Sequence, residues 1–238
     1  MSYIFASMSA SEIWFLENID AEGIFCPKKL SHSDSFHEHN IYKKNDYIFQ
    51  PGESADRIYF ITRGRVQIDS EGDELKSVTK AILGQGEIFG EKAILGQSKR
   101  RDFATALEET EVCAIPKDHM KELFKDHSPL YIFMMNLIGS RALEMEKRLE
   151  SLVFKDSRSR IIEFLIGLNA KKGQRVGYEW VVRRFLTHQQ IANLTATSRQ
   201  TVTTVLNNLR NQNILTFNRK RLLIRDLDEL KAQLNVVP

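Results

Sequence analysis

Hydrophobic and polar positions alternate in several short segments between residues 40 and 115. A period of two residues is typical of β-strands, and the glycines between the segments suit turns that need a positive φ. Strands spaced this regularly predict a jelly-roll or Greek-key β-barrel. The predicted strands are 47–49, 58–61, 66–68, 81–83 and 112–115, and the predicted turn glycines are Gly52, Gly64, Gly72, Gly86 and Gly90.

The period changes between residues 128 and 154, where apolar residues recur at alternating steps of four and three. This spacing is the heptad seam of a coiled coil, and it predicts a long helix that pairs with the same helix of a second chain. Packing of the helix on its own barrel alone is the alternative. The seam residues are Tyr131, Met135, Ile138, Ala142, Met145, Leu149 and Leu152.

A third segment follows a predicted hinge at Phe154–Asp156. Asp156 is suited to cap a helix that runs from Ser157 to about Ala170. At the other end of the chain, residues 9–26 are predicted to be helical and residues 31–35 to form a loop. We therefore expect three parts: an effector-sensing β-barrel domain with an N-terminal helix at 1–127, a dimerisation helix at 128–154 and a DNA-binding domain at 155–238.

Residues 187–215 have the pattern of a helix-turn-helix, which is the reason for assigning DNA binding to the last part. Thr187 followed three residues later by Gln190 predicts a capping box at the start of the first helix. Ser198 is suited to cap the second helix. The turn between them contains Ala196 where glycine is usual, and a positive φ costs alanine about 1 kcal/mol. In DNA-binding proteins of this type the second helix lies in the major groove.

The outward positions on the first turns of that second helix carry side chains that can read bases. Arg199 can bond guanine through two donors, Gln200 can do the same with adenine, and the methyl groups of Thr203 and Thr204 suit thymine. Two amphipathic helices with a short turn also occur in proteins that bind no DNA. The interpretation therefore depends on the surrounding sequence.

Charge is distributed unevenly along this chain, whose formal net charge is only +3. Residues 155–238 contain 15 Lys and Arg against 6 Asp and Glu, a net charge of +9, and the remaining 19 and 25 give residues 1–154 a net charge of −6. Two predicted strands, 214–217 and 221–224, enclose a basic turn that is typical of a wing. The C-terminal part is thus suited to a polyanion. The candidate DNA-binding residues are Thr187, Ser198, Arg199, Gln200, Thr203, Thr204, Arg219 and Arg221.

Several other classes of protein are disfavoured. No run of eighteen apolar residues and no signal peptide is found, which predicts a cytoplasmic protein with no membrane partner. Cys26 and Cys113 are the only cysteines, so a disulfide framework, a structural zinc and an iron–sulfur cluster are not expected. The segment His37–His39 suggests haem or metal, but a solvated histidine pair in a polar loop is the preferred interpretation. No grouping of catalytic residues predicts an enzyme.

The order of these parts resembles the cyclic-AMP receptor protein/fumarate-nitrate regulator (CRP/FNR) superfamily of bacterial transcription factors, over nearly the whole chain. The segments that carry the resemblance are Gln50–Glu53, Ile58–Gly64, Gly86–Glu91 and Ser198–Val202. It implies a homodimer that binds a palindromic operator in double-stranded DNA, with RNA polymerase as a further partner. It also implies that Arg199, Gln200 and Thr204 contact bases. Gln200 replaces the family's usual Glu, so a different operator preference is expected.

The resemblance further implies an effector site in the barrel. The family's cyclic-nucleotide cassette is Phe-Gly-Glu followed about ten residues later by Arg-Ser or Arg-Thr, and this chain has Phe89–Glu91 followed by Arg100, Arg101 and Asp102. In one alignment Arg100 takes the Arg role and Arg101 replaces the hydroxyl. In the other, Arg101 takes the Arg role and Asp102 replaces the hydroxyl, which would put a carboxylate beside a phosphate.

Cyclic AMP is not the expected effector. The Thr-Ser pair that contacts adenine in the cyclic-AMP receptor corresponds here to Met145 and Glu146, which cannot make the same contacts. Another small anionic effector and no effector at all both remain open, and so does a competing function as a cyclic-nucleotide-binding module that binds no specific DNA. The candidate effector-binding residues are Gly90, Glu91, Arg100, Arg101 and Arg141.

Overall fold

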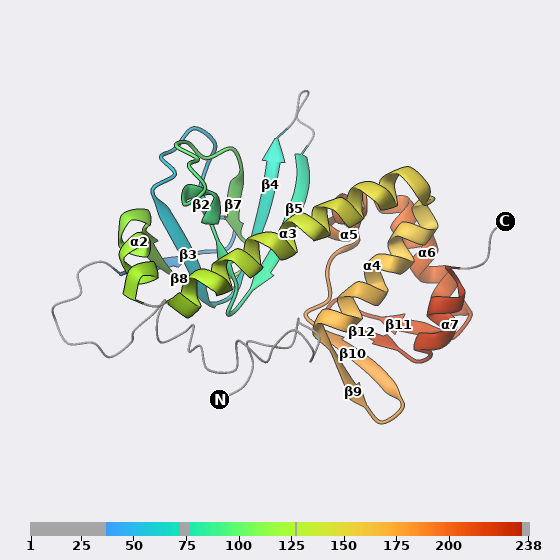
Figure 1. Ribbon diagram of the computed structural model, residues 1–238. Coiled ribbons are helices and arrows are strands. Elements are labelled where there is room, and N and C mark those ends of the chain that lie inside the picture. The colour runs from blue at the N-terminus through green and yellow to red at the C-terminus, as the bar shows by residue number, and fades with distance from the viewer. Residues whose placement is uncertain (1–36, 72–76, 127, 235–238) are drawn as a thin grey trace. The chain divides into compact units, whose positions relative to one another are not determined.

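A computed structural model describes residues 37–71, 77–126 and 128–234 (Figure 1). The predicted N-terminal helix at 9–26, the predicted loop at 31–35, Cys26 and Gly72 lie outside these ranges. The chain divides into two compact units, and the division falls between Ala142 and Leu143.

Two four-stranded antiparallel sheets form the N-terminal unit. Their strand orders are β1-β8-β3-β6 and β2-β7-β4-β5. The predicted jelly-roll class is confirmed, although the strands form two separate sheets and not a closed barrel. The strands are β1 Glu38–Tyr42, β2 Tyr47–Phe49, β3 Arg57–Arg63, β4 Arg65–Glu71, β5 Ser77–Gly84, β6 Ile88–Phe89, β7 Phe103–Ala106 and β8 Thr110–Pro116.

Strand β3 lies between two layers of apolar side chains. Tyr59 and Ile61 pack between the two sheets. Ile58 and Phe60 pack on the other side with residues of helices α2 (Lys117–Asp126) and α3 (Ser128–Phe154). Because successive side chains of a strand point to opposite faces, a strand buried on both sides has a continuous apolar run. This explains why β3 contains four consecutive buried residues.

The predicted turn glycines of the described residues all have positive φ: Gly52, Gly64, Gly86 and Gly90. Gly64 joins β3 to β4 with a φ of +91°. A Cβ at this position would lie 2.5 Å from Oγ1 of Thr110 and 2.7 Å from the carbonyl oxygen of Glu109. Only glycine therefore fits the turn that leads from β3 of the first sheet into β4 of the second.

Strands β1, β6 and β7 were not predicted, because they are short or lack apolar alternation. The interpretation of His37–His39 as part of a polar loop is wrong for Glu38 and His39. These two residues begin β1 and lie opposite Ala114 and Cys113 of β8. Most of the side chains of β1 are exposed, so backbone pairing rather than side-chain burial holds this strand.

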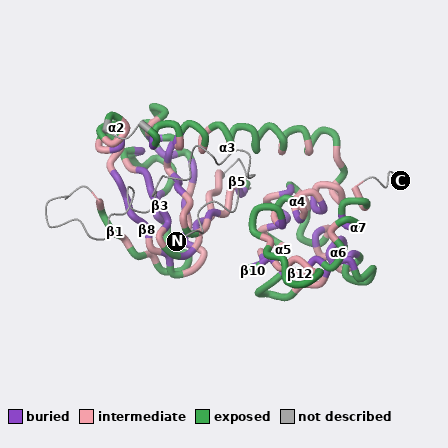
Figure 2. The backbone as a smooth tube through the Cα atoms, turned by 60° about the horizontal axis from the view of Figure 1, so that its bottom comes forward, coloured by how far each residue is buried: buried purple, intermediate pink, exposed green. Residues whose placement is uncertain are grey.

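Helix α3 is one continuous helix of 27 residues, as the heptad pattern predicts. Leu130 and Met134 are buried and cover one face of the first sheet. Most seam residues do not take part in this packing, and Figure 2 shows α3 exposed along most of its length. Within the N-terminal unit, the seam residues Tyr131 and Met135 are therefore not buried against the sheets. The exposed seam residues include Tyr131 (53%), Met135 (50%), Met145 (54%), Leu149 (64%) and Leu152 (48%).

The C-terminal unit combines helices with one antiparallel sheet of order β11-β12-β10-β9. Its single core contains Ile161, Leu165, Val202 and Leu206, all fully buried. The strands β9 and β10 and the helix α7 were not predicted. The elements are α4 Ser157–Lys172, β9 Gly173–Val176, β10 Glu179–Arg183, α5 His188–Thr195, α6 Arg199–Asn211, β11 Leu215–Phe217, β12 Arg221–Ile224 and α7 Leu227–Ala232.

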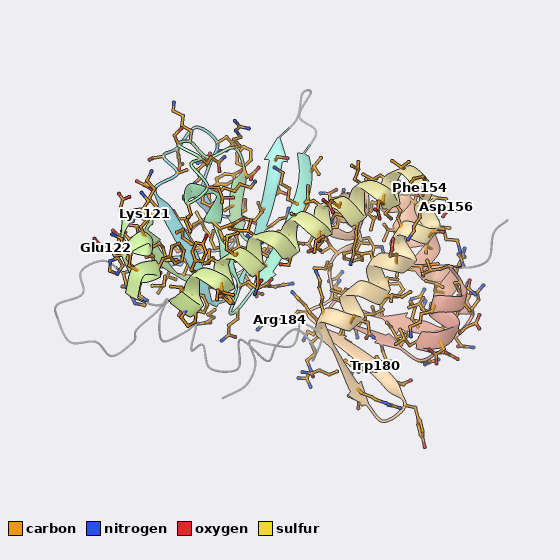
Figure 3. The ribbon with its side chains drawn as sticks, in the orientation of Figure 1. Lys121, Glu122, Phe154, Asp156, Trp180 and Arg184 are labelled. Carbon is orange, nitrogen blue, oxygen red and sulfur yellow. The ribbon has the colours of Figure 1, made fainter. Side chains whose placement is uncertain are left out.

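The junction between α3 and α4 lies within this unit, between the labelled Phe154 and Asp156 (Figure 3). Asp156 is the predicted N-cap of α4, and its Oδ1 accepts a hydrogen bond from the backbone N–H of Ser159 at 2.8 Å. The helix ends two residues later than predicted. Among the described residues, no helix has the length and apolar composition needed to span a membrane.

Candidate nucleic-acid interface and effector site

Helix α5 begins and ends as the sequence predicts. Oγ1 of Thr187 accepts from the backbone N–H of Gln190 at 3.2 Å, and Oε1 of Gln190 accepts from the backbone N–H of Thr187 at 3.0 Å. This is the predicted capping box. The helix ends at Thr195, and the capping residue Ala196 has a φ of 49° and a ψ of 50°. The turn therefore holds an alanine in the left-handed region, at a cost of about 1 kcal/mol.

Arg160 of α4 holds this turn in place. Its Nε donates to the carbonyl oxygen of Thr195 at 3.0 Å, and its Nη2 donates to that of Ala196 at 3.1 Å. Its Nη1 donates to the carbonyl oxygen of Lys155, which precedes the cap of α4, at 2.8 Å. One guanidinium thus connects the α3–α4 junction to the helix-turn-helix. Arg160 was not predicted from the sequence, because bonds to backbone carbonyls leave no residue pattern.

Helix α6 has one buried and one exposed face. Oγ of Ser198 accepts from the backbone N–H of Thr201 at 3.0 Å and caps the helix, as predicted. Arg199, Gln200 and Thr204 are exposed, whereas Thr203 is half-buried. The first three are thus exposed as predicted, but the prediction of an outward position for Thr203 is wrong, because its hydroxyl bonds within the unit. The buried face consists of Val202, Val205, Leu206 and Leu209.

His188, which the sequence analysis did not single out, contacts the half-buried Thr203. Its Nδ1 lies 2.8 Å from Oγ1 of Thr203. The same hydroxyl donates to the carbonyl oxygen of Arg199 at 2.9 Å. The imidazole also packs against Phe217 of β11, with the ring centroids 5.5 Å apart. Burial and then the positive charge of Arg199 lower the pKa of His188 below its ordinary value.

The predicted wing forms between β11 and β12. Oδ1 of Asn218 accepts from the backbone N–H groups of Lys220 at 2.8 Å and Arg221 at 3.0 Å, which fixes the turn. Arg219, Lys220 and Arg221 are all exposed. Three cations on a rigid turn next to the helix-turn-helix are suited to phosphate groups.

The candidate effector residues are arranged differently, because most of them bond to one another or to the backbone. Arg100 is 4% exposed. Its Nη1 donates to the carbonyl oxygen of Gly90 at 3.2 Å, and its Nη2 donates to that of Arg57 at 2.5 Å. The guanidinium carbon lies 4.3 Å from the ring centre of Phe49. Its Nε has no acceptor among the described residues. Arg101, by contrast, is exposed.

Gly90 allows this approach of Arg100. It has a φ of +79°, and a Cβ there would lie 3.1 Å from Nη1 of Arg100, the carbonyl oxygen of Arg57 and Cδ2 of Tyr59. A side chain at this position would therefore be strained and would crowd the guanidinium.

Glu91 and Arg141 form an ion pair, with Oε2 and Nη1 2.5 Å apart. Glu91 is buried in the short 3-10 helix η2 (Glu91–Ala93), and Arg141 is on α3. Nη2 of Arg141 also donates to the carbonyl oxygen of Ile88 at 2.5 Å. The structure thus brings four of the five candidate effector residues into two bonded groups, and Arg101 belongs to neither.

Asp102 lies buried between two lysines. Its Oδ1 is 2.5 Å from Nζ of Lys80, and its Oδ2 is 2.7 Å from Nζ of Lys92. Burial raises the pKa of Asp102, but the hydrogen bonds with Lys80 and Lys92 lower it more, so the carboxyl pKa is below its ordinary value. From the sequence, Asp102 was predicted only as a replacement for a hydroxyl, in one of the two alignments. Its two lysine partners were not predicted.

Within the described ranges, no group of three or more His, Cys, Asp and Glu residues is placed to hold a metal ion. Cys113 is buried, and its Sγ lies 3.7 Å from Nδ1 of His37.

Comparison with known proteins agrees with this architecture. A family model of the cyclic nucleotide-binding domain matches residues 40–127, and one of the Crp-like helix-turn-helix domain matches residues 159–233. The chain is 28% identical to the global nitrogen regulator of Synechocystis sp. over 200 residues, which cover 81% of this chain and 86% of that protein. It is 27% identical to the cyclic AMP receptor protein of Thermus thermophilus, over 79% of this chain and 84% of that one.

A solved structure is also similar. A CooA mutant from Carboxydothermus hydrogenoformans superposes with a TM-score of 0.73 and 26% identity, over 83% of this chain and 88% of that chain. The similarity therefore extends across both units and is not confined to one motif.

Proposed function

The chain belongs to the CRP/FNR superfamily of transcription regulators, and we propose that it acts as a homodimer that binds a palindromic operator through its two α6 helices. The observation that carries the proposal is the sidedness of α6. Its apolar face is buried in the core, and Arg199, Gln200 and Thr204 are exposed. These are the side-chain types that read guanine, adenine and thymine in the major groove.

The exposed seam of α3 supports a homodimer. Apolar residues at heptad spacing from Tyr131 to Leu152 extend over about 30 Å of helix. An exposed apolar surface of this kind is rare on a monomer, and the same surface on a second copy would cover it. A two-fold dimer would also present two α6 helices to the two halves of a palindrome.

The dimer is tested by Met145→Asp. A charge in the seam should shift the protein towards monomer in sedimentation and weaken operator binding, because one copy contacts only half a site. Lys147→Asp introduces the same residue at an exposed position outside the seam and should remain dimeric. Dimers of equal strength for both variants would place the dimer interface elsewhere.

The operator is tested by selecting bound DNA from a random pool, with and without a panel of nucleotides. We expect enrichment of an inverted repeat whose half-sites lie one helical turn apart. Absence of any enriched sequence at moderate salt would favour the competing function, a nucleotide-binding module that binds no specific DNA. RNA polymerase is the proposed second partner, and the cytoplasm is the proposed location.

For the N-terminal unit we infer a small anionic effector other than cyclic AMP. The buried Nε of Arg100 is a donor that an anion would satisfy. Cyclic AMP does not fit these residues in the manner of the family. Glu91 is already paired with Arg141, and Met145 and Glu146 replace the adenine contacts. Thermal shifts with inorganic phosphate and a panel of cyclic nucleotides test this. Equal shifts for the wild type and Arg100→Met would leave Gly90 and Glu91 as a structural turn.

We also propose that function divides along the sequence as residues 1–127 for sensing, 128–154 for dimerisation and 155–238 for DNA binding. The ends of α3 at Ser128 and Phe154 support these boundaries.

A further inference from the structure

We propose that Thr203 reads the methyl group of a thymine in each half-site and that His188 is the positioning residue that fixes Thr203 for this contact. The inference rests on the proposed function, because it concerns the same DNA surface. Thr203 is already a candidate residue of that surface, and the structure adds how its hydroxyl is bonded and which residue positions it. It starts from the two hydrogen bonds of one hydroxyl group.

The hydroxyl of Thr203 has a single proton to donate. That proton is used in the bond to the carbonyl oxygen of Arg199, one turn earlier in α6 at 2.9 Å. Oγ1 must therefore act as the acceptor in its 2.8 Å contact with Nδ1 of His188. Two consequences follow. His188 carries a proton on Nδ1, and the hydroxyl of Thr203 has no donor left for a base.

The direction of these bonds decides what Thr203 can recognise. Its oxygen is turned towards its own helix and towards α5, and the residue is half-buried. With the hydroxyl engaged in this way, the methyl group is the part of the Thr203 side chain left to contact a base. In the major groove the matching apolar group is the C5-methyl of thymine. Thr203 is therefore assigned an apolar contact rather than a hydrogen bond.

His188 is itself held from three elements, which makes it suitable for positioning. It is the first residue of α5, directly after the capping residue Thr187. Its ring packs against Phe217 of β11, and its Nδ1 contacts Thr203 of α6. Phe217 is covered in turn by the guanidinium of Arg210, 5.1 Å from the ring centre. The imidazole thus holds the side chain of Thr203 on α6 in a fixed position relative to α5 and β11.

The test uses the full-length protein and the operator obtained by selection. Each thymine of a half-site is replaced in turn by deoxyuridine, which differs only by the absence of the methyl group. At one position of each half-site we expect wild-type affinity to fall by about three- to five-fold, the effect of one buried methyl group. Thr203→Ser keeps the hydroxyl and loses the methyl, so it should bind the thymine and uracil operators equally at that position. Thr204→Ser is the matched control and should retain the wild-type discrimination there.

The role of His188 is tested by comparing three variants for the same discrimination. The side-chain nitrogen of asparagine can occupy the place of Nδ1, so His188→Asn should keep most of it. His188→Gln places its amide further out and should lose discrimination, as should His188→Ala. Thermal unfolding establishes that each variant is folded. Equal discrimination by His188→Ala and His188→Asn would remove His188 from the proposal.

The outcomes separate this inference from the proposed function. A selected operator without a methyl-sensitive thymine, or one whose sensitivity survives Thr203→Ser, overturns the assignment of Thr203 and leaves the operator-binding function intact. If no DNA sequence is selected at all, both are overturned.

Discussion

The two candidate sites use the same types of charged residue in opposite ways. In the N-terminal unit, Glu91, Arg100 and Arg141 are partly or fully buried, and their charges are bonded to one another or to backbone carbonyls. In the C-terminal unit, Arg199 and Arg219 are exposed on a capped helix and a fixed turn. A buried charge that loses its partners costs far more than an exposed one. The comparison therefore predicts that substitutions in the first site change stability and that those in the second change DNA binding.

The largest effect is expected for Arg100→Met. The substitution keeps an apolar stem but leaves the carbonyl oxygens of Gly90 and Arg57 without their donor. Two lost bonds from a charged donor should lower the free energy of unfolding by about 3 kcal/mol. Chemical denaturation measures this change. Arg101→Met is the control, since Arg101 is exposed and should change stability by less than about 0.5 kcal/mol. Equal effects for the two would remove the contrast between the buried and the exposed arginine.

The opposite pattern, a change in DNA binding with little change in stability, is expected for Arg199→Ala. It should weaken operator binding by about 1–3 kcal/mol and relax specificity at one base pair of each half-site, with little change in unfolding. Arg219→Ala should weaken binding to all sequences alike. It should also reduce the slope of the logarithm of the binding constant against the logarithm of the salt concentration by about one. Titrations on the operator and on random DNA at several salt concentrations distinguish the two. If both variants lose the same affinity on both DNAs, Arg199 does not read a base.

The sequence predicts the C-terminal site better than the N-terminal one, for a physical reason. Helical period and capping residues are local, so Thr187, Ser198 and the exposed face of α6 follow from neighbouring residues. Whether Arg100 or Arg101 aligns with the Arg of the family's cassette depends on whether the alignment has a one-residue gap between Glu91 and these arginines. Only the fold shows which of the two is buried.

Contacts between elements that are distant in sequence were not predictable. Arg160 and His188 looked like ordinary residues of a basic domain, because their partners are a turn carbonyl and a hydroxyl that the fold brings near. Strands such as β1 and β9 were missed for a similar reason. Their side chains are mostly exposed, and their partners in the sheet, not their own pattern, make them strands.

The smallest effect is expected for Asp102, a buried carboxylate of the N-terminal unit. It concerns the pH dependence of the free energy of unfolding. Its pKa is lowered in the folded protein by Lys80 and Lys92 against the opposing effect of burial. A carboxyl group with a lowered pKa stabilises the fold above its unfolded pKa, near 3.9 for Asp, and this contribution is lost as the pH falls through the folded value. Wild type should therefore be more stable than Asp102→Asn at pH 7, and the difference should shrink on acidification below about pH 4. Urea denaturation between pH 7 and pH 3 measures the difference, with Glu53→Gln as the control for loss of an exposed carboxylate. A difference that stays constant over this range would mean that the two lysines do not stabilise the charge of Asp102.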